Sequence, residues 1–351
     1  MALAVGCGQA RDLPPVVWEG QHLRYRTFES TAGICAGTFQ HLDDRAGAIQ
    51  QIFGSRAGPV DYSWTPGDTL SAYCDSDVGC AEPGSATSRW PIDEHELFHA
   101  SRPSNAHRGF EEGLAVFYGD DRELPGAVGK DVDTILRAAG AHRLPPQTDY
   151  PTLAHFVSYL TAQYGHHALA ELASASDLTD EYRDFASDVG AVLGRPLQAI
   201  LSDFTGDYPV CTTQDFRDDT IECGQDGIDL PLDPGGAIDT VTRVDCHDPG
   251  TAGPTGPEIW TTLVLRVPET GAYRYSIVPD TSAFPVRVDF AECNTSCFDV
   301  ADSVNQSFAG VRDATACLRQ GSYRLRFALE THNSANFHVT FERLRSTGRC
   351  D

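Results

Sequence analysis

Several features are scarce in this chain of 351 residues, and each absence narrows what it can be. No window approaches the ~18–20 uninterrupted apolar residues of a transmembrane helix, so we expect no membrane span. Basic residues are few: 26 Lys and Arg stand against 50 Asp and Glu and leave a formal net charge of −24. An acidic surface of this kind repels phosphate backbones, and we therefore expect no nucleic-acid partner.

The composition that is present is that of an ordinary globular protein. Hydrophobic residues make up 41% of the chain and charged residues 22%, which supplies enough apolar material for sizeable cores. At about 100–200 residues per domain, this length indicates two or three domains, and the sequence pattern below favours two. We place a polar, Pro-rich tether in residues 1–20, a first domain in residues 21–205 and a second domain in residues 206–351.

Cysteine is abundant, with eleven residues spread along the chain and no CxxC pair of the kind that a zinc ribbon uses. Such a spread is typical of disulfides and of an oxidising compartment. We expect every cysteine except Cys7 to be bonded, with Cys74–Cys80 and Cys211–Cys223 as local pairs. Residues 4–7 (Ala-Val-Gly-Cys) resemble a bacterial lipobox, whose cysteine is lipidated. We therefore expect export to the periplasm or cell surface, with membrane contact only through an anchor at Cys7.

The apolar periodicity of the first domain is mostly helical. His22–Phe28 and Val60–Trp64 alternate as strands do, whereas Cys35–Phe53 carries the repeat of an amphipathic helix. Residues 74–84 are hydrophilic and are predicted to form a loop. From about residue 91 to residue 205 the period is helical, so we predict a mainly helical domain.

Beyond Gly206, short alternating runs replace the helical period, and Gly, Pro and Asp turns separate them. This pattern predicts a disulfide-rich, antiparallel β-sandwich over residues 206–351. No catalytic constellation is visible within it. The runs predicted as strands are Thr261–Val267, Tyr273–Ile277, Val286–Phe290, Tyr323–Ala328 and Phe337–Phe341.

The segment from His95 to His99 (His-Glu-Leu-Phe-His) is an HExxH motif. On a helix, positions i and i+4 share a face, so His95 and His99 can both direct a ring nitrogen at one Zn²⁺. Glu96, one step round the helix, can reach a water bound to that metal but not the metal itself. The motif therefore predicts two zinc ligands and a general base.

A third ligand is predicted at Glu112, thirteen positions after His99. Catalytic zinc takes three protein ligands and keeps one open position for water. The distance along the chain leaves room for a loop and for a second helix, starting near Gly109, that packs back across the first. The alternative is that Glu111 and Glu112 form a solvated helix start, where carboxylates suit the helix dipole.

HExxH followed by the Glu-Gly-Leu-Ala sequence at residues 112–115 resembles the gluzincin metallopeptidases over roughly residues 20–205. The resemblance implies a zincin-like metallopeptidase domain that binds Zn²⁺ through His95, His99 and Glu112, with Glu96 as general base. It also implies an oxyanion donor at Tyr150, because members often carry a tyrosine at the start of the next helix. Tyr159 and His155 are the rivals for that role.

Two departures from the family pattern concern the metal site. The stretch between His99 and Glu112 is shorter than in the best-known aminopeptidases of the family. An acidic residue often follows the third ligand by four places and orients a zinc histidine, but here that position is Val116. The histidines then need another carboxylate or a backbone carbonyl as a partner.

Together these observations predict an α+β protein: a mainly helical zincin-like metallopeptidase domain followed by an antiparallel β-sandwich. The predicted function is zinc-dependent hydrolysis of peptide bonds, with peptides or proteins as substrates. The alternative is a non-catalytic surface lipoprotein, in which the gluzincin fold is a scaffold and the β module binds. Retention of Glu96 favours the enzyme, because a scaffold has no need of the base. The sequence indicates no oligomeric state.

Overall fold

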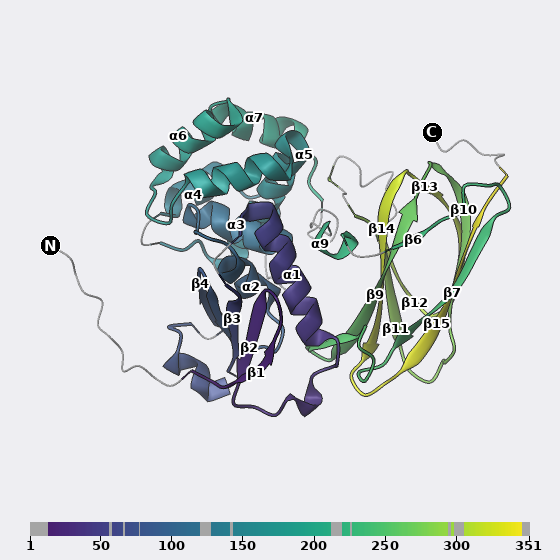
Figure 1. The fold of residues 1–351 in the computed structure, drawn as a ribbon. Coiled ribbons are helices and arrows are strands. Elements are labelled where there is room, and N and C mark those ends of the chain that lie inside the picture. The colour runs from purple at the N-terminus through teal and green to yellow at the C-terminus, as the bar shows by residue number, and fades with distance from the viewer. Residues whose placement is uncertain are drawn as a thin grey trace.

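The first part of the chain is built around a β-sheet as well as helices (Figure 1). The computed structural model describes residues 13–55, 58–65, 67–76, 78–119, 128–140, 143–211, 220–224, 227–293, 296–297 and 305–345. Within them, five strands form one sheet in the order β1-β2-β3-β5-β4. These strands are β1 (Val16–Glu19), β2 (Leu23–Thr27), β3 (Val60–Trp64), β4 (Gly79–Glu82) and β5 (Ser85–Ser88).

This sheet is mixed, and β4 forms one of its edges. Strands β2, β3 and β5 run parallel to one another, while β1 and β4 pair antiparallel at the two edges. Helices α1 (Thr38–Phe53) and α2 (Glu94–Ser101) pack on the sheet, where residues such as Tyr62, Leu42 and Leu97 share one buried cluster. The helix that carries the HExxH motif is therefore held against the sheet, beside strand β4.

The predicted fold class is wrong for the first domain, because a five-stranded sheet contradicts a mainly helical zincin-like domain. The two strands that sequence periodicity indicates, near His22–Phe28 and Val60–Trp64, are present as β2 and β3. The others escape detection because each is only four residues long and none alternates clearly between apolar and polar residues. Strand β1 lies in the predicted tether, and β4 begins within the predicted loop.

A helical layer follows the sheet in the chain. Its apolar core joins residues such as Phe110, Phe156, Phe185 and Phe204 from four different helices. The longest helix, α5, is interrupted at Gly165, whose φ of 79° lies in the left-handed region that favours glycine. The helices of this layer are α3 (Arg108–Tyr118), α4 (Val132–Ala138), α5 (Tyr150–Ala175), α6 (Tyr182–Leu193) and α7 (Leu197–Asp207).

The second part of the chain is a β-sandwich of two sheets, drawn in green and yellow in Figure 1. One sheet has the order β13-β10-β15-β7, and the other has the order β12-β11-β14-β9-β6 with β8 paired to β9. Alternate residues point inward, so Tyr275, Phe290, Phe327 and Phe341 meet in one core. Of the pairings in these two sheets, β6 with β9 is parallel.

The strand bounds of the sandwich contain or overlap all five predicted runs. Each predicted run matches one long strand, and the remaining strands are mostly shorter. The strands are β6 (Gly227–Asp229), β7 (Ala237–Val244), β8 (Ala252–Thr255), β9 (Glu258–Val267), β10 (Gly271–Pro279), β11 (Val286–Glu292), β12 (Asn305–Ala309), β13 (Arg312–Leu318), β14 (Gly321–Glu330) and β15 (Ala335–Arg343).

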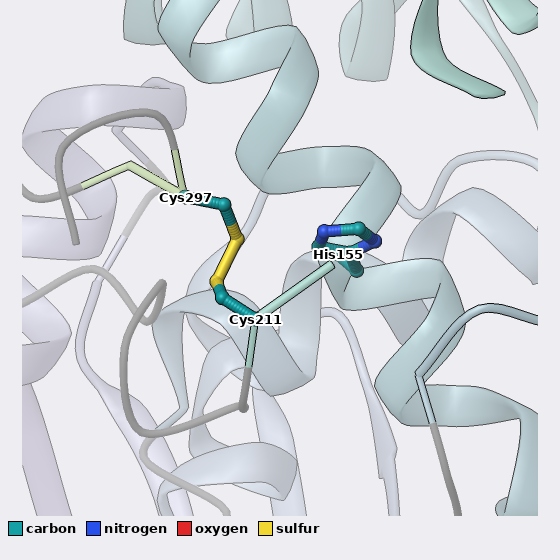
Figure 2. Close-up of side chains that lie close together, drawn as sticks. All are labelled: His155, Cys211 and Cys297. Carbon is teal, nitrogen blue, oxygen red and sulfur yellow. A yellow bond between two sulfur atoms is a disulfide. The ribbon is translucent and has the colours of Figure 1, made fainter. Parts of the chain in front are cut away.

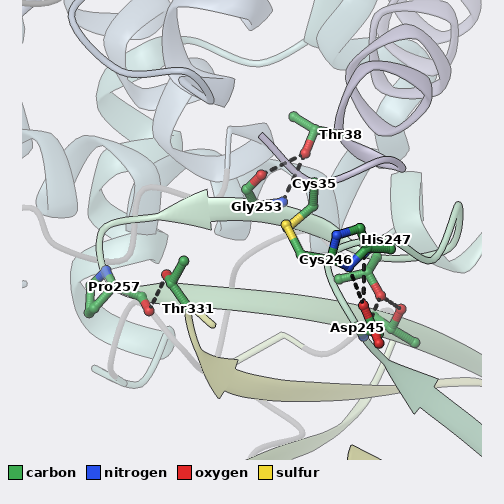
Figure 3. The surroundings of a disulfide bond; sticks show 10 residues. Cys35, Thr38, Asp245, Cys246, His247, Gly253, Pro257 and Thr331 are labelled. Carbon is green, nitrogen blue, oxygen red and sulfur yellow. Dashed lines mark hydrogen bonds and ion pairs between the residues drawn. A yellow bond between two sulfur atoms is a disulfide. The ribbon is translucent and has the colours of Figure 1, made fainter. Parts of the chain in front are cut away.

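The two parts are joined at the start of α1, which contacts both β2 and β8. Figure 3 shows the Cys35–Cys246 disulfide there, which links positions 211 residues apart. Beside it, the Thr38 hydroxyl donates to the Gly253 carbonyl at 2.8 Å, and the Gly253 N–H donates back to that hydroxyl at 3.0 Å. A covalent bond and reciprocal hydrogen bonds therefore fix the sandwich against the first domain.

The interface also has a buried core and a buried ion cluster. Trp260 and Ala328 of the sandwich belong to the same apolar cluster as the sheet and α1 of the first domain. Helix α9 (Thr220–Cys223) supplies Glu222, whose carboxylate pairs with the buried Arg324 at 3.0 Å and with Arg326. The outer face of the β14–β9 sheet is thus turned toward the first domain.

Candidate metal centre

The site begins at the N-terminus of α2, where the backbone is held by a capping network. The Asp93 side chain accepts a hydrogen bond from the Glu96 N–H at 3.1 Å and another from the Ser88 hydroxyl at 2.6 Å. Asp at the N-cap satisfies one of the helix's orphan donors, and carboxylates in the first turn suit the helix dipole. The cap therefore fixes the direction in which the HExxH helix leaves β5.

The three predicted metal ligands converge on one point. His95 Nε2 lies 3.2 Å from Glu112 Oε2 and 3.2 Å from His99 Nε2, and His99 Nε2 lies 3.7 Å from Glu112 Oε2. Donor atoms bound at about 2.0–2.2 Å around one tetrahedral Zn²⁺ are about 3.4 Å apart. Two imidazoles and one carboxylate at this spacing fit zinc in both chemistry and geometry.

Glu112 reaches the histidines because α3 packs tightly against α5. A Cβ added at Gly113 would lie only 2.9 Å from the carbonyl oxygen of Leu153, so this position needs a glycine. Phe110, Leu114 and Phe117 are buried on the same helix, as an amphipathic repeat predicts. The tight helix contact therefore places Glu112, the third predicted ligand, beside the two histidines.

A second carboxylate, Glu111, orients His99 from the other side of its ring. Glu111 Oε1 lies 2.9 Å from His99 Nδ1, while its second oxygen pairs with Arg102 and accepts from the Ala106 N–H at 2.8 Å. Burial alone would raise the pKa of Glu111, but Arg102 and His99 hold it below its ordinary value. Glu111 can therefore orient the histidine, a role for which the family often uses an acidic residue at the position of Val116.

We expect Glu111→Gln to weaken zinc binding about 10–100-fold, the usual effect of losing a carboxylate that orients a zinc histidine. The amide is uncharged and stabilises the bound imidazole less. Competition with a chelating indicator measures the affinity. Glu171→Gln is the matched control, because Glu171 also pairs with a histidine, His167 at 3.5 Å, but on the exposed surface. Equal affinity in the Glu111 variant and the wild type would contradict the role.

Glu96 stands beside the three ligands and faces strand β4. A Cβ added at Gly79 would lie 3.0 Å from Glu96 Oε1, so the strand passes close to this carboxylate. Burial raises the pKa of Glu96 to about 7, and the neighbouring His95 and His99 oppose that rise. A carboxylate with such a pKa can take up and release a proton near neutral pH.

The site opens into a cleft of about 1120 Å³ that both parts of the chain line. The first domain contributes β4, the start of α2 and the start of α5. The outer face of the second sheet of the sandwich forms the opposite wall. The described sandwich residues in that wall include Glu258, Trp260, Arg287, Asp289, Arg324 and Arg326. The sandwich is therefore part of the site and not a module set apart from it.

Of the three candidate oxyanion donors, Tyr150 is the one in this cleft. Its ring stacks on the His95 ring, with centroids 5.9 Å apart and planes 1° from parallel. Tyr159 instead packs against Phe204 in the helical core. His155 Nε2 donates to the Pro209 carbonyl at 3.0 Å and likewise lies outside the described cleft lining.

A second group of metal-binding residue types lies around His155, with Cys211 and Cys297 (Figure 2). The two sulfur atoms form a disulfide, so they are not available as the thiolates that bind zinc. The bond joins the end of the helical layer to the sandwich across 86 residues. This cluster is a covalent link between the two parts of the chain.

The disulfides confirm one predicted pair and correct the other. Cys74–Cys80 is present, but Cys211 bonds Cys297 and Cys223 bonds Cys293 in place of the predicted Cys211–Cys223 pair. Four disulfides between described residues are typical of an oxidising, extracellular environment. Cys317 is also disulfide-bonded, and Cys7 lies outside the described residues.

No protein-family model and no curated protein matches the chain. Among solved structures, Legionella pneumophila aminopeptidase A in complex with aspartic acid is 12% identical over 91% of this chain and 35% of that chain, with a TM-score of 0.33. The pre-peptidase C-terminal domain of a Bacillus anthracis collagenase is 8% identical over 34% of this chain and 98% of that chain, with a TM-score of 0.21. A Podospora anserina GH26-CBM35 β-(1,4)-mannanase is 15% identical over 33% of this chain and 29% of that chain, with a TM-score of 0.21.

The chain thus spans about a third of the aminopeptidase. TM-scores this low establish no shared fold, and the chemistry of the site follows from its own residues.

Proposed function

We propose that this protein is a zinc-dependent peptide hydrolase of the gluzincin type, with Glu96 as its general base. The observation that carries the proposal is the convergence of His95, His99 and Glu112 beside Glu96, at the wall of an open cleft. A purely structural zinc site is closed by four protein ligands, whereas three ligands and a cleft suit catalysis.

Bound zinc lowers the pKa of water toward neutrality and polarises a carbonyl group. Glu96 accepts the proton of the attacking water and passes it to the leaving amine. Tyr150 is our candidate to donate a hydrogen bond to the developing oxyanion, because it lines the cleft and stacks on His95.

Strand β4 supports a peptide as the substrate. It is the last strand of its sheet, and no other described strand pairs with its outer edge. An extended peptide can add to such an edge through main-chain hydrogen bonds. Because Gly79 of β4 lies against Glu96, a peptide on this edge would pass the general base.

We also propose that the protein works at the bacterial cell surface or in the periplasm, held by a lipid anchor at Cys7. The disulfides support export, and the resemblance of residues 4–7 to a lipobox supports the anchor. Helices long and apolar enough to cross a bilayer are absent from the described part of the chain.

The experiment that tests the function is removal and restoration of the metal. Dialysis against a strong chelator should abolish cleavage of a broad peptide pool, and one equivalent of Zn²⁺ per chain should restore it, as metal analysis and mass spectrometry of the pool can measure. A protein fully loaded with zinc that cleaves nothing at neutral pH would contradict the proposal. That result would favour the alternative, a non-catalytic lipoprotein whose β module binds.

A further inference from the structure

Trp90 is a large aromatic side chain left exposed inside the cleft. It lies between β5 and α2, is 44% exposed and lines the same cavity as the HExxH residues. The neighbouring Val78, which is 37% exposed, lines the cavity as well. Exposed apolar surface in a concave site marks a place where a ligand packs.

The backbone at Trp90 is fixed although its ring is exposed. The Trp90 carbonyl accepts a hydrogen bond from the Tyr62 hydroxyl at 2.9 Å, and its N–H donates to the Ser88 hydroxyl oxygen at 3.1 Å. The Arg89 guanidinium lies 4.4 Å from the ring centroid and covers part of the ring. A rigid aromatic ring loses little conformational entropy when a ligand packs on it.

The strand register places Trp90 near the general base. Gly79 pairs with Ser88, the last residue of β5, and Gly79 is the position that lies against Glu96. Trp90 follows two residues after that strand end, so its Cα lies at most about 7 Å from the Cα of Ser88. An extended peptide on β4 with its scissile bond near Glu96 would therefore place a side chain one or two residues away against this ring.

We propose that Trp90 and Val78 form an apolar subsite that selects peptides with a large aliphatic or aromatic side chain one or two residues from the cleaved bond. The inference rests on the proposed function and adds the class of substrate to it. When the substrate side chain packs on the Trp90 ring, apolar surface of both is removed from water. This burial favours large apolar side chains and so supplies the selectivity.

The test separates binding from turnover. Zinc-loaded Glu96→Gln protein is immobilised and exposed to a peptide pool in which one position at a time carries Phe, Leu, Ala or Asp. Mass spectrometry of the retained peptides gives the enrichment of Phe and Leu over Ala. The same measurement is made with Trp90→Ala added and with Phe28→Ala added. Phe28 is the matched control, because it is 64% exposed in the first domain but is not among the described residues of the cleft.

We expect Phe and Leu to be enriched at one position and Trp90→Ala to reduce that enrichment about tenfold, the scale of a lost apolar contact. Phe28→Ala should leave it unchanged, and zinc content should be equal in all variants. With Glu96 restored, the cleavage-site preference should change in the same way.

Two results would overturn the subsite: enrichment that survives Trp90→Ala, or enrichment that Phe28→Ala reduces equally. The Glu96→Gln protein could retain peptides with the expected preference while the protein with Glu96 restored cleaves none. That result would contradict the proposed function and leave the subsite standing. Cleavage without any apolar preference would do the reverse. Failure of the Glu96→Gln protein to bind any peptide, together with no cleavage by the wild-type protein, would contradict both.

Discussion

Replacing Glu96 with glutamine should lower turnover of a peptide pool at least about 100-fold, the scale of losing a positioned general base. Glutamine keeps the size and shape of the side chain but cannot accept the proton. Since Glu96 is not a metal ligand, zinc content should stay at about one per chain. Initial rates by mass spectrometry and metal analysis of the same samples measure both quantities.

Two other substitutions serve as controls for this result. Glu82→Gln changes an exposed carboxylate at the far end of β4, which is not among the described residues of the cleft, and should leave turnover unchanged. His99→Ala should lose zinc and activity together, because two ligands hold the metal far less tightly than three. Cleavage that persists unchanged in the Glu96 variant would point to a different catalytic centre or to a contaminating protease.

Removing the Cys35–Cys246 disulfide by a double change to alanine should cost stability more than removing any short-range bond. In the chain-entropy model, closing a loop of about 200 residues stabilises a fold by about 5 kcal/mol, whereas a loop of about six residues gives about 2 kcal/mol. The bond also clamps the sandwich wall against the first domain. Urea unfolding of the full chain, with midpoint and slope recorded, measures the loss.

The matched control is the Cys74→Ala, Cys80→Ala variant, whose bond closes a separation of only 6 residues. Both variants lose two sulfur atoms and one crosslink. The difference between their losses of stability therefore reflects the length and position of the closed loop. A loss in the Cys35–Cys246 variant no greater than in the control would mean that noncovalent contacts, such as those of Thr38 and Trp260, already hold the two parts together.

The convergence of His95, His99 and Glu112 could be predicted from the sequence because its signals are local. His95 and His99 are one helical turn apart, so their shared face follows from helix geometry alone. Glu112 could be predicted because zinc requires a third ligand and the chain supplies a glutamate on the next amphipathic helix. The role of the adjacent Glu111 could not, because it depends on Arg102 and on the path of the loop between the two helices.

Three strands of the first sheet, β1, β4 and β5, were not predicted, and for β4 and β5 the physical reason is different. Strands β4 and β5 gain their stability from pairing with each other and with β3, and not from an apolar alternation of their own. Their sequence, with Gly79, Cys80 and several serines and small residues, is indistinguishable from that of a polar loop. Edge strands next to a site are hard to detect in this way, although β4 is central to the proposed substrate path.

Disulfide partners and the shared cleft depend on contacts between distant residues. Cys211 and Cys223 are neighbours in sequence, yet each bonds a cysteine at least 70 residues away. Likewise, no local pattern indicates that Arg287 and Trp260 of the sandwich face the HExxH helix. Periodicity identifies which residues are buried in an element but not which element covers them.

The shared cleft has a consequence for the order in which the protein is made. Chains emerge from the ribosome N-terminus first, so the HExxH helix is synthesised about 160 residues ahead of Trp260 and more than 220 ahead of Arg324 in the opposite wall. Contacts of such sequence separation carry a high loop-closure cost. The opposite wall of the cleft therefore cannot be in place until the last third of the chain has been synthesised. Its closing crosslink, Cys35–Cys246, forms only where thiols are oxidised.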